Sequence, residues 1–279
     1  KDYKIPFLVI EPAKNEYRAL VKSIPELQVF TPGKNFISPF VFNPFVPPKN
    51  VRLETYKSTL KTAFAAAVSM ATPLDKIFEE SINNCYSDFR WLDTYTVDDK
   101  GKTFNISDFI KCFQQTFNEI GYTGDAKNIG RAGVVRLNSL VNLFDNYFSI
   151  PIEDILKKPT IIELAAIENS DQKALIIALL LLSILAYVNS NYIGEGGLKN
   201  VILLEDLRLT KSQRDYRLEG QLKNIEYMIC FFNYFNLYGF PTLPSPSSIW
   251  ILDFRYNAGR TSPKALALIS RNKIPVHHT

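Results

Sequence analysis

Residues Lys199–Leu209 read Lys-Asn-Val-Ile-Leu-Leu-Glu-Asp-Leu-Arg-Leu, and this stretch decides the fold class. The segment from Asn200 to Leu204 has the continuous apolar character of a strand buried in the interior of a parallel sheet. Two acids, Glu205 and Asp206, follow at its carboxyl end. Carboxylates placed there can orient a Mg²⁺ ion and polarise an attacking water. We therefore predict an α/β fold in which this strand delivers Glu205 as a metal and catalytic residue and Asp206 as a general base.

Further strand patterns lie on both sides of this stretch. Phe7–Glu11 is a continuous apolar run between two prolines, which suits the interior of a parallel sheet. The segment 160–164 is followed by a long apolar helix and then by the strand at 201–204, so these three elements predict a right-handed, parallel βαβ unit. The strands that we expect are residues 7–11, 27–30, 160–164, 201–204 and 249–253.

The middle of the chain has a helical period instead. Apolar residues recur at helical spacing from Leu60 to Val68, and the segments 77–86 and 109–120 repeat this pattern. Ser107, before Asp108, is the helix cap that we expect there. The predicted organisation is a first part of the core at 1–50, a large helical insertion at 51–150, a second part of the core at 151–210, and an unassigned segment at 211–279.

Composition limits the kinds of site. The chain has 279 residues, 46% apolar content and a net charge of +4. Cys85, Cys112 and Cys230 are widely spaced and form no C-x-x-C pair, so we expect neither a disulfide framework nor a zinc site, and a reducing, cytoplasmic setting. The two histidines, His277 and His278, lie at the end of the sequence, which argues against a histidine-based catalytic triad.

The apolar run Ala174–Val188 is shorter than the ~20 residues that span a bilayer. We therefore expect a buried helix and no membrane contact. The sequence shows no signal peptide and begins with Lys1, which we interpret as a protein cut at its N-terminus.

A phosphate-binding loop of the form G-x-x-x-x-G-K-[ST] does not occur in the sequence. Gly194, Gly196 and Gly197 precede the strand at 201–204 rather than follow a strand, so they are interpreted as a connector. The sequence thus carries acids suited to hydrolysis without the loop that grips phosphates.

Four motifs taken in order resemble one family, the HerA/FtsK-like ring ATPases, in particular its bacterial HerA-type branch. Residues 5–20 resemble the strand and turn that follow the phosphate-loop helix in that family. Residues 38–45 resemble the next block, and residues 158–175 resemble the strand and helix before the Walker B strand. Residues 200–208 resemble the Walker B segment itself. The resemblance covers about residues 5–209.

The resemblance implies a RecA-like core, ATP and Mg²⁺ as cofactors, and translocation of duplex DNA by a hexameric ring, with a nuclease as a possible partner. Three departures limit it. The phosphate loop would lie before Lys1. Leu207-Arg208 stands where the family has Ala-His. The family's later strand and turn have only a weak match in this sequence, at Thr261–Lys264.

Further candidates for the nucleotide site follow from position. Glu11, Lys14 and Glu16 come after a parallel strand, where open α/β sheets bind ligands, although an ordinary polar loop has the same pattern. Arg131 and Arg136 would act by reaching a neighbouring subunit's site, or else they are ion-paired or DNA-facing surface arginines. Glu163 lies inside a strand and is either an ion-paired sheet residue or a residue near the pore.

Two main functions are compatible with this pattern. The first is part of an ATPase that couples ATP hydrolysis to DNA translocation and is catalytically incomplete as given. The alternative is a non-catalytic RecA-like module for ring assembly or nuclease docking. A DNA-binding domain of another fold is less consistent with the modest net charge.

Overall fold

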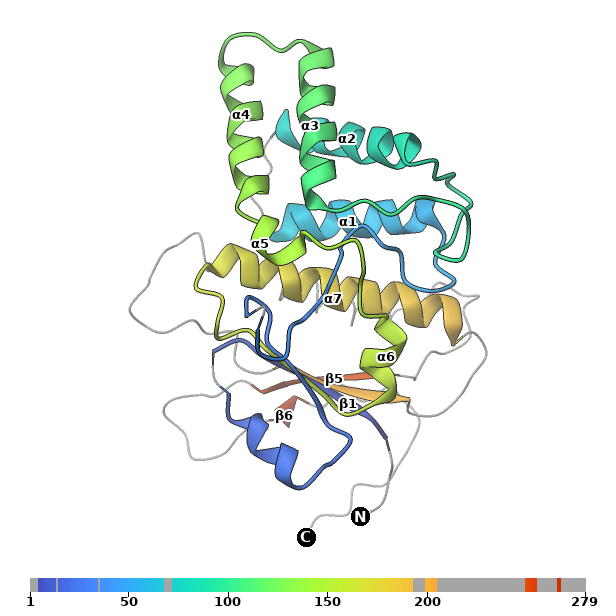
Figure 1. Ribbon diagram of the computed structural model, residues 1–279, viewed down its shortest axis with the longest axis vertical. Coiled ribbons are helices and arrows are strands. Elements are labelled where there is room, and N and C mark those ends of the chain that lie inside the picture. The colour runs from blue at the N-terminus through green and yellow to red at the C-terminus, as the bar shows by residue number, and fades with distance from the viewer. Residues whose placement is uncertain are drawn as a thin grey trace.

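A mostly parallel sheet forms the base of the molecule, as a computed structural model shows (Figure 1). The structure describes residues 5–13, 15–34, 36–67, 72–192, 199–204, 249–254 and 265–266. Within these residues the strand order is β2-β3-β1-β4-β5-β6, and only the β5–β6 pairing is antiparallel. The strands are β1 (Phe7–Glu11), β2 (Gln28–Phe30), β3 (Thr160–Glu163), β4 (Asn200–Leu204), β5 (Ile249–Phe254) and β6 (Ala265–Leu266).

All five predicted strands are confirmed, and the parallel α/β class with them. β1, the continuous apolar run, is a central strand with β3 on one side and β4 on the other. Because β1 lies between them, the crossover from β3 through the long helix to β4 passes over one strand. The interior residues Leu8, Val9 and Ile10 are buried, as expected for a strand in the middle of a parallel sheet.

The helix between β3 and β4 is α7 (Ser170–Asn191). It begins at Asn169, whose side chain accepts hydrogen bonds from the backbone N–H groups of Asp171 and Gln172. In the described part of the chain, α7 is long and apolar enough to cross a membrane, but 72% of its apolar window is buried inside the molecule. It is the central helix of the core, as the apolar run predicts.

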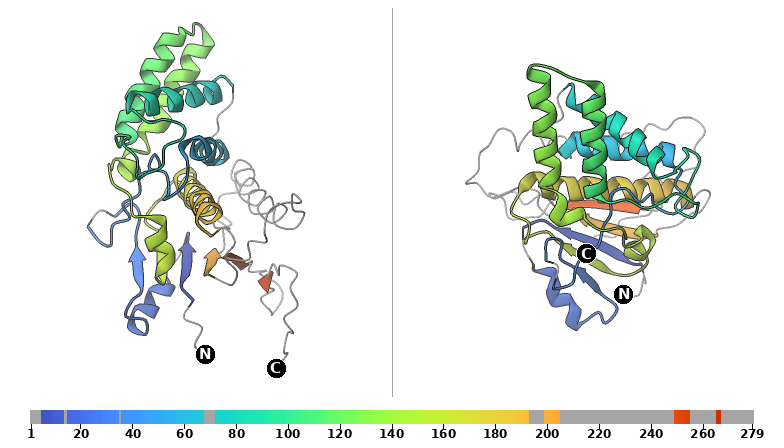
Figure 2. Two further views of the ribbon diagram at one scale, coloured as in Figure 1. Left: turned by 90° about the vertical axis from the view of Figure 1, so that its right-hand side faces the viewer. Right: turned by 45° about the horizontal axis from the view of Figure 1, so that its top comes forward.

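In the described residues six helices lie between β2 and β3, and the first five of them fall within the segment 51–150. α7 lies between the sheet and these helices, with α1 packed along it (Figures 1 and 2). α3 and α4 stand side by side at the end of the molecule away from the sheet (Figure 1). The helices are α1 (Leu53–Ala67), α2 (Leu74–Asp88), α3 (Ile106–Ile120), α4 (Asp125–Asn138) and α5 (Val141–Phe144), and α6 (Ile152–Lys157) precedes β3.

The cap predicted for α3 is wrong by two residues. Asn105, not Ser107, is the N-cap: its side chain accepts from the Asp108 backbone N–H at 3.0 Å, while the Asp108 side chain accepts from the Asn105 N–H. Asp108 occupies the third helical position, so the two residues form a reciprocal capping box. Asn105 was not predicted as the cap because the apolar Ile106 was not recognised as the first residue of the helix.

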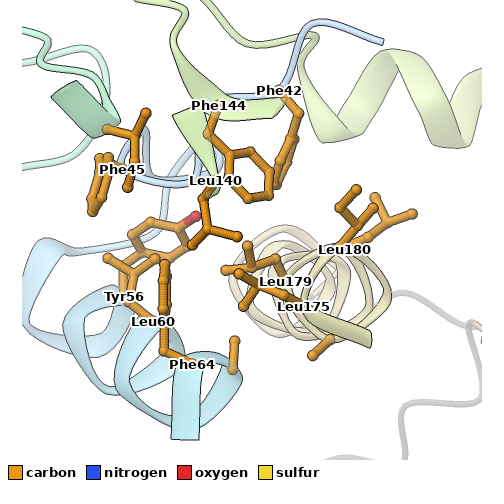
Figure 3. Close-up of a cluster of buried hydrophobic side chains, with 14 of the residues drawn as sticks. Phe42, Phe45, Tyr56, Leu60, Phe64, Leu140, Phe144, Leu175, Leu179 and Leu180 are labelled. Carbon is orange, nitrogen blue, oxygen red and sulfur yellow. The ribbon is translucent and has the colours of Figure 1, made fainter. Parts of the chain in front are cut away.

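An extended segment, 38–45, connects the sheet to the helices and packs into the core. Phe42 and Phe45 point into the cluster formed by α1, α5 and α7 (Figure 3). Two buried phenols hold the backbone of this segment. The Tyr56 hydroxyl donates to the Pro44 carbonyl at 2.9 Å, and the Tyr86 hydroxyl donates to the Phe45 carbonyl at 2.7 Å. These bonds satisfy carbonyls that no helix or strand would satisfy.

Burial of these phenols predicts a loss of stability at alkaline pH. Desolvation raises the pKa of Tyr56 and of Tyr86 above the ordinary value of 10.0. Above pH ~10 the unfolded chain therefore loses these protons first, so the free energy of unfolding falls as pH rises, by up to about 1.4 kcal/mol per pH unit for each group. Denaturant unfolding of the wild type and of Tyr56→Phe/Tyr86→Phe between pH 8 and 11 measures this. The variant should show a flatter decline, and two parallel curves would contradict the prediction.

Candidate functional site at the carboxyl edge of the sheet

Two buried carboxylates lie next to each other where β1 and β3 end. Glu11 is in register with Glu163, and both residues are fully buried. The Leu164 N–H donates to the Glu11 carbonyl at 2.9 Å, so the pairing continues through the last residues of the two strands. The carboxyl edge of a parallel sheet is where α/β folds place their ligands, and this is the edge at which polar groups gather here.

Arg18 neutralises one of the two carboxylates. Its Nε donates to Glu163 Oε1 at 2.9 Å, and its Nη2 donates to Glu163 Oε2 at 2.6 Å. The two bonds together form a bidentate ion pair. The same guanidinium donates to the Thr31 hydroxyl at 3.2 Å. The bond to Glu163 raises the pKa of Arg18. Of the two interpretations left open for Glu163, the structure supports the ion-paired sheet residue.

Glu11 organises the chain that leaves β1. Its Oε1 accepts the backbone N–H of Glu16 at 2.7 Å. The turn is thereby closed just before the short 3₁₀-helix η1 (Tyr17–Lys22), which carries Arg18. Glu16 contributes its backbone to this contact, and its side chain is exposed. Glu11 thus supports the loop and the arginine that follow it.

Lys173 brings a second cation to the same edge. It lies in the first turn of α7, and its Nζ donates to the Pro12 carbonyl at 2.9 Å, directly after β1. Partial burial lowers the pKa of this lysine. The bond ties the amino end of α7 to the end of β1. Sequence reasoning missed both Arg18 and Lys173, although a glutamate inside a buried strand is itself a signal that a cation lies nearby.

The acids of the opening stretch lie outside the described residues. β4 ends at Leu204, which pairs with Ile10 on one side and with Asp253 of β5 on the other. Ile10 immediately precedes Glu11, so β4 ends beside Glu11, while Glu163 lies on the other side of β1. Glu205, Asp206 and Lys14 are outside the part of the chain that the structure describes, and their predicted roles stay predictions.

The two candidate arginines are not brought to this edge within one chain. Arg131 and Arg136 lie on α4, are exposed, and belong to the helical end that α7 separates from the sheet (Figure 1). A role at the nucleotide site would require a second subunit. That role stays a prediction.

The described edge can organise charge but does not by itself form a metal site. Both oxygens of Glu163 are engaged by Arg18 and one oxygen of Glu11 is engaged by a backbone N–H. Within the described ranges there is no cluster of three side chains of the kind that holds a metal ion. The edge therefore offers buried negative charge, two cations and a closed turn, next to the end of β4 at Leu204.

Comparison with known proteins gives a likeness of fold. No protein-family profile matches the chain, and no curated protein matches its sequence. Eight chains of solved structures do match. One is VirB4 of Thermoanaerobacter pseudethanolicus, with a TM-score of 0.50 and 14% sequence identity over 80% of each chain. At this identity the likeness shows a shared fold, and it supports a RecA-like α/β core.

Proposed function

We propose that this chain is the RecA-like core of an ATPase of the HerA/FtsK-like type that couples ATP hydrolysis to movement of DNA. The observation that carries the proposal is the carboxyl edge of the sheet. There β4 ends next to the end of β1 that carries Glu11, Glu163 lies on the other side of β1, and the sequence continues after β4 with Glu205 and Asp206. The fold shared with VirB4, a P-loop ATPase of the FtsK/HerA-like type, supports the same class of enzyme.

The proposed roles of the acids follow from their order after β4. Glu205 would hold a magnesium ion through its water shell, and Asp206 would accept the proton of the attacking water. Aspartate is one methylene shorter than glutamate, so Asp206 requires the water to lie close to the end of the strand. Arg18, Thr31 and Glu163 form the hydrogen-bonded network that keeps the neighbouring strand ends fixed.

The residues fit Mg²⁺ better than they fit a triphosphate. Carboxylate oxygens are the ligands that Mg²⁺ prefers, and Glu205 and Asp206 supply them at the end of a buried strand. The sequence contains no G-x-x-x-x-G-K-[ST] motif, which in phosphate loops supplies the amide cradle and the lysine. The proposal therefore requires that another stretch of protein supply the phosphate grip.

Assembly and partners belong to the same proposal. A hexameric ring would bring Arg131 or Arg136 of one subunit towards the nucleotide of the next, where an arginine can stabilise the charge of the transferred phosphoryl group. DNA would be the translocated substrate, with a nuclease as a possible partner, in the cytoplasm and without membrane attachment. The family resemblance of residues 5–209 supports these expectations.

A titration of the 279-residue chain with a fluorescent ATP analogue tests whether the chain binds nucleotide without a phosphate loop. We expect no saturation at micromolar nucleotide, because neither the amide cradle nor the lysine is present. The matched positive result comes from the natural protein that contains this chain, which should bind the same analogue with Mg²⁺ present. Micromolar binding by the chain alone would contradict the proposal that another stretch of protein supplies the phosphate-binding groups. Absence of binding in the natural protein would favour the non-catalytic scaffold.

A further inference from the structure

Two cysteines that are far apart in sequence meet between α2 and α3. Cys85 is fully buried on α2, and Cys112 is 9% exposed on α3. The Cys112 thiol donates to the Ser81 carbonyl at 3.6 Å. Ser81 lies one helical turn before Cys85, and its carbonyl points along α2 towards that residue. The bond therefore holds the Cys112 sulfur beside Cys85.

The two thiols differ in reactivity. Hydrogen bonding from Cys85 lowers the pKa of Cys112, with a smaller contribution in the same direction from Thr116, although burial and the nearby Asp88 and Glu119 carboxylates oppose it. The pKa of Cys85 is raised by the same hydrogen bond and by burial. Since the thiolate is the nucleophile, these pKa shifts favour Cys112 as the attacking thiol.

A cleft lies next to one of the two cysteines. Its volume is about 270 Å³, and it lies between α2 and α3. Cys112 lines this cleft and Cys85 does not. The other lining residues are polar: Asn84, Ser87, Asp88, Gln115, Thr116 and Glu119. Cys112 is therefore the cysteine of the pair that lies at this cleft, while Cys85 does not line it.

We propose that Cys85 and Cys112 form a peroxide-oxidised disulfide site that links α2 to α3, with Cys112 attacking and Cys85 resolving. The Cys112 thiolate attacks one oxygen of hydrogen peroxide, giving a sulfenic acid and releasing hydroxide. The Cys85 thiol then attacks the Cys112 sulfur, the S–S bond forms, and water leaves. In sum, two thiols lose two electrons and two protons, and the peroxide is reduced to two waters.

This site goes beyond the proposed ATPase function and does not depend on it. This site is not visible in the sequence, because the two cysteines are separated by 26 residues and lack a C-x-x-C spacing. A reducing compartment does not exclude it, since disulfides found there are commonly transient and redox-sensing. The disulfide would join α2 to α3, in the helical region that α7 separates from the sheet.

The test is peptide mapping of the folded 279-residue chain after treatment with a small excess of hydrogen peroxide, followed by alkylation without reduction. We expect a cross-linked peptide pair that joins Cys85 to Cys112, lighter than the two thiol peptides by about 2 Da and lost on reduction with dithiothreitol. Recovery of both peptides in alkylated form would overturn the proposal. A dominant cross-link to Cys230 would overturn it as well.

Single variants assign the roles and guard against a folding artefact. In Cys85→Ala, peroxide should leave a sulfenic acid on Cys112 that a dimedone probe labels, because the resolving thiol is gone. In Cys112→Ala, Cys85 should stay unlabelled, since it does not line the cleft. Circular dichroism checks that each variant is folded. The peptide map of the wild type needs no substitution, so it tests the disulfide even if a variant does not fold. Equal labelling of the two variants would contradict the assigned order.

Discussion

Replacing Glu205 with glutamine or Asp206 with asparagine is expected to lower ATP turnover by the natural protein at least about a hundredfold and to leave nucleotide binding intact. Each change removes one negative charge from the end of β4 while keeping the size of the side chain. Loss of the metal-orienting charge or of the proton acceptor raises the barrier to hydrolysis. Neither acid is proposed to grip the phosphates, so the dissociation constant of the nucleotide should change little.

Steady-state hydrolysis and nucleotide titration, run on the same preparations, measure the two quantities separately. Glu80→Gln is the matched control, because Glu80 is an exposed acid on α2 in the helical end of the molecule. It should leave both quantities unchanged. Turnover in Glu205→Gln or Asp206→Asn equal to that of Glu80→Gln would remove the substituted acid from the site.

Substitution of Arg18 by methionine is expected to destabilise the fold by about 2–3 kcal/mol. The Glu163 side chain is 1% exposed, so removing its bidentate partner leaves a buried carboxylate without a counter-charge. This value is below the roughly 3–5 kcal/mol typical of fully buried pairs because the Arg18 side chain is 45% exposed, and water screens part of the interaction. Denaturant unfolding followed by circular dichroism measures the loss.

A double-variant cycle separates the ion pair from simple packing. Arg18→Met/Glu163→Met replaces both charges with apolar groups and should recover most of the stability lost in Arg18→Met, since the buried charge is gone. Arg52→Met is the matched control, because Arg52 faces Glu54 at 3.8 Å with both side chains largely exposed. It should cost under about 1 kcal/mol. A double variant as unstable as Arg18→Met would show that the arginine acts through packing alone.

The sheet was predictable from the sequence because its strands carry their signal locally. Phe7–Glu11 and Asn200–Leu204 are short, continuous apolar runs, and burial on both faces of a parallel strand requires that pattern. The order of the strands was not predictable in the same way. That β1 lies between β3 and β4 depends on contacts between segments separated by well over a hundred residues.

The sequence pointed to the carboxyl edge of the sheet but not to the contacts made there. Glu11 was recognised as a polar residue after a strand and Glu163 as an acid inside a strand, and the register that makes them neighbours follows from the parallel pairing. Arg18 and Lys173 were missed, because their roles arise from where η1 and α7 begin relative to the strand ends. The contact between Cys85 and Cys112 is of the same kind, since it depends on how two helices pack.

The most direct test of the proposed enzyme is ATP hydrolysis by the natural protein that contains this chain, measured with Mg²⁺ in the presence and absence of duplex DNA. We predict magnesium-dependent turnover that DNA accelerates and that Glu205→Gln/Asp206→Asn abolishes. A protein that binds ATP and Mg²⁺ but hydrolyses no ATP with or without DNA, or one whose turnover survives the double substitution, would contradict the account.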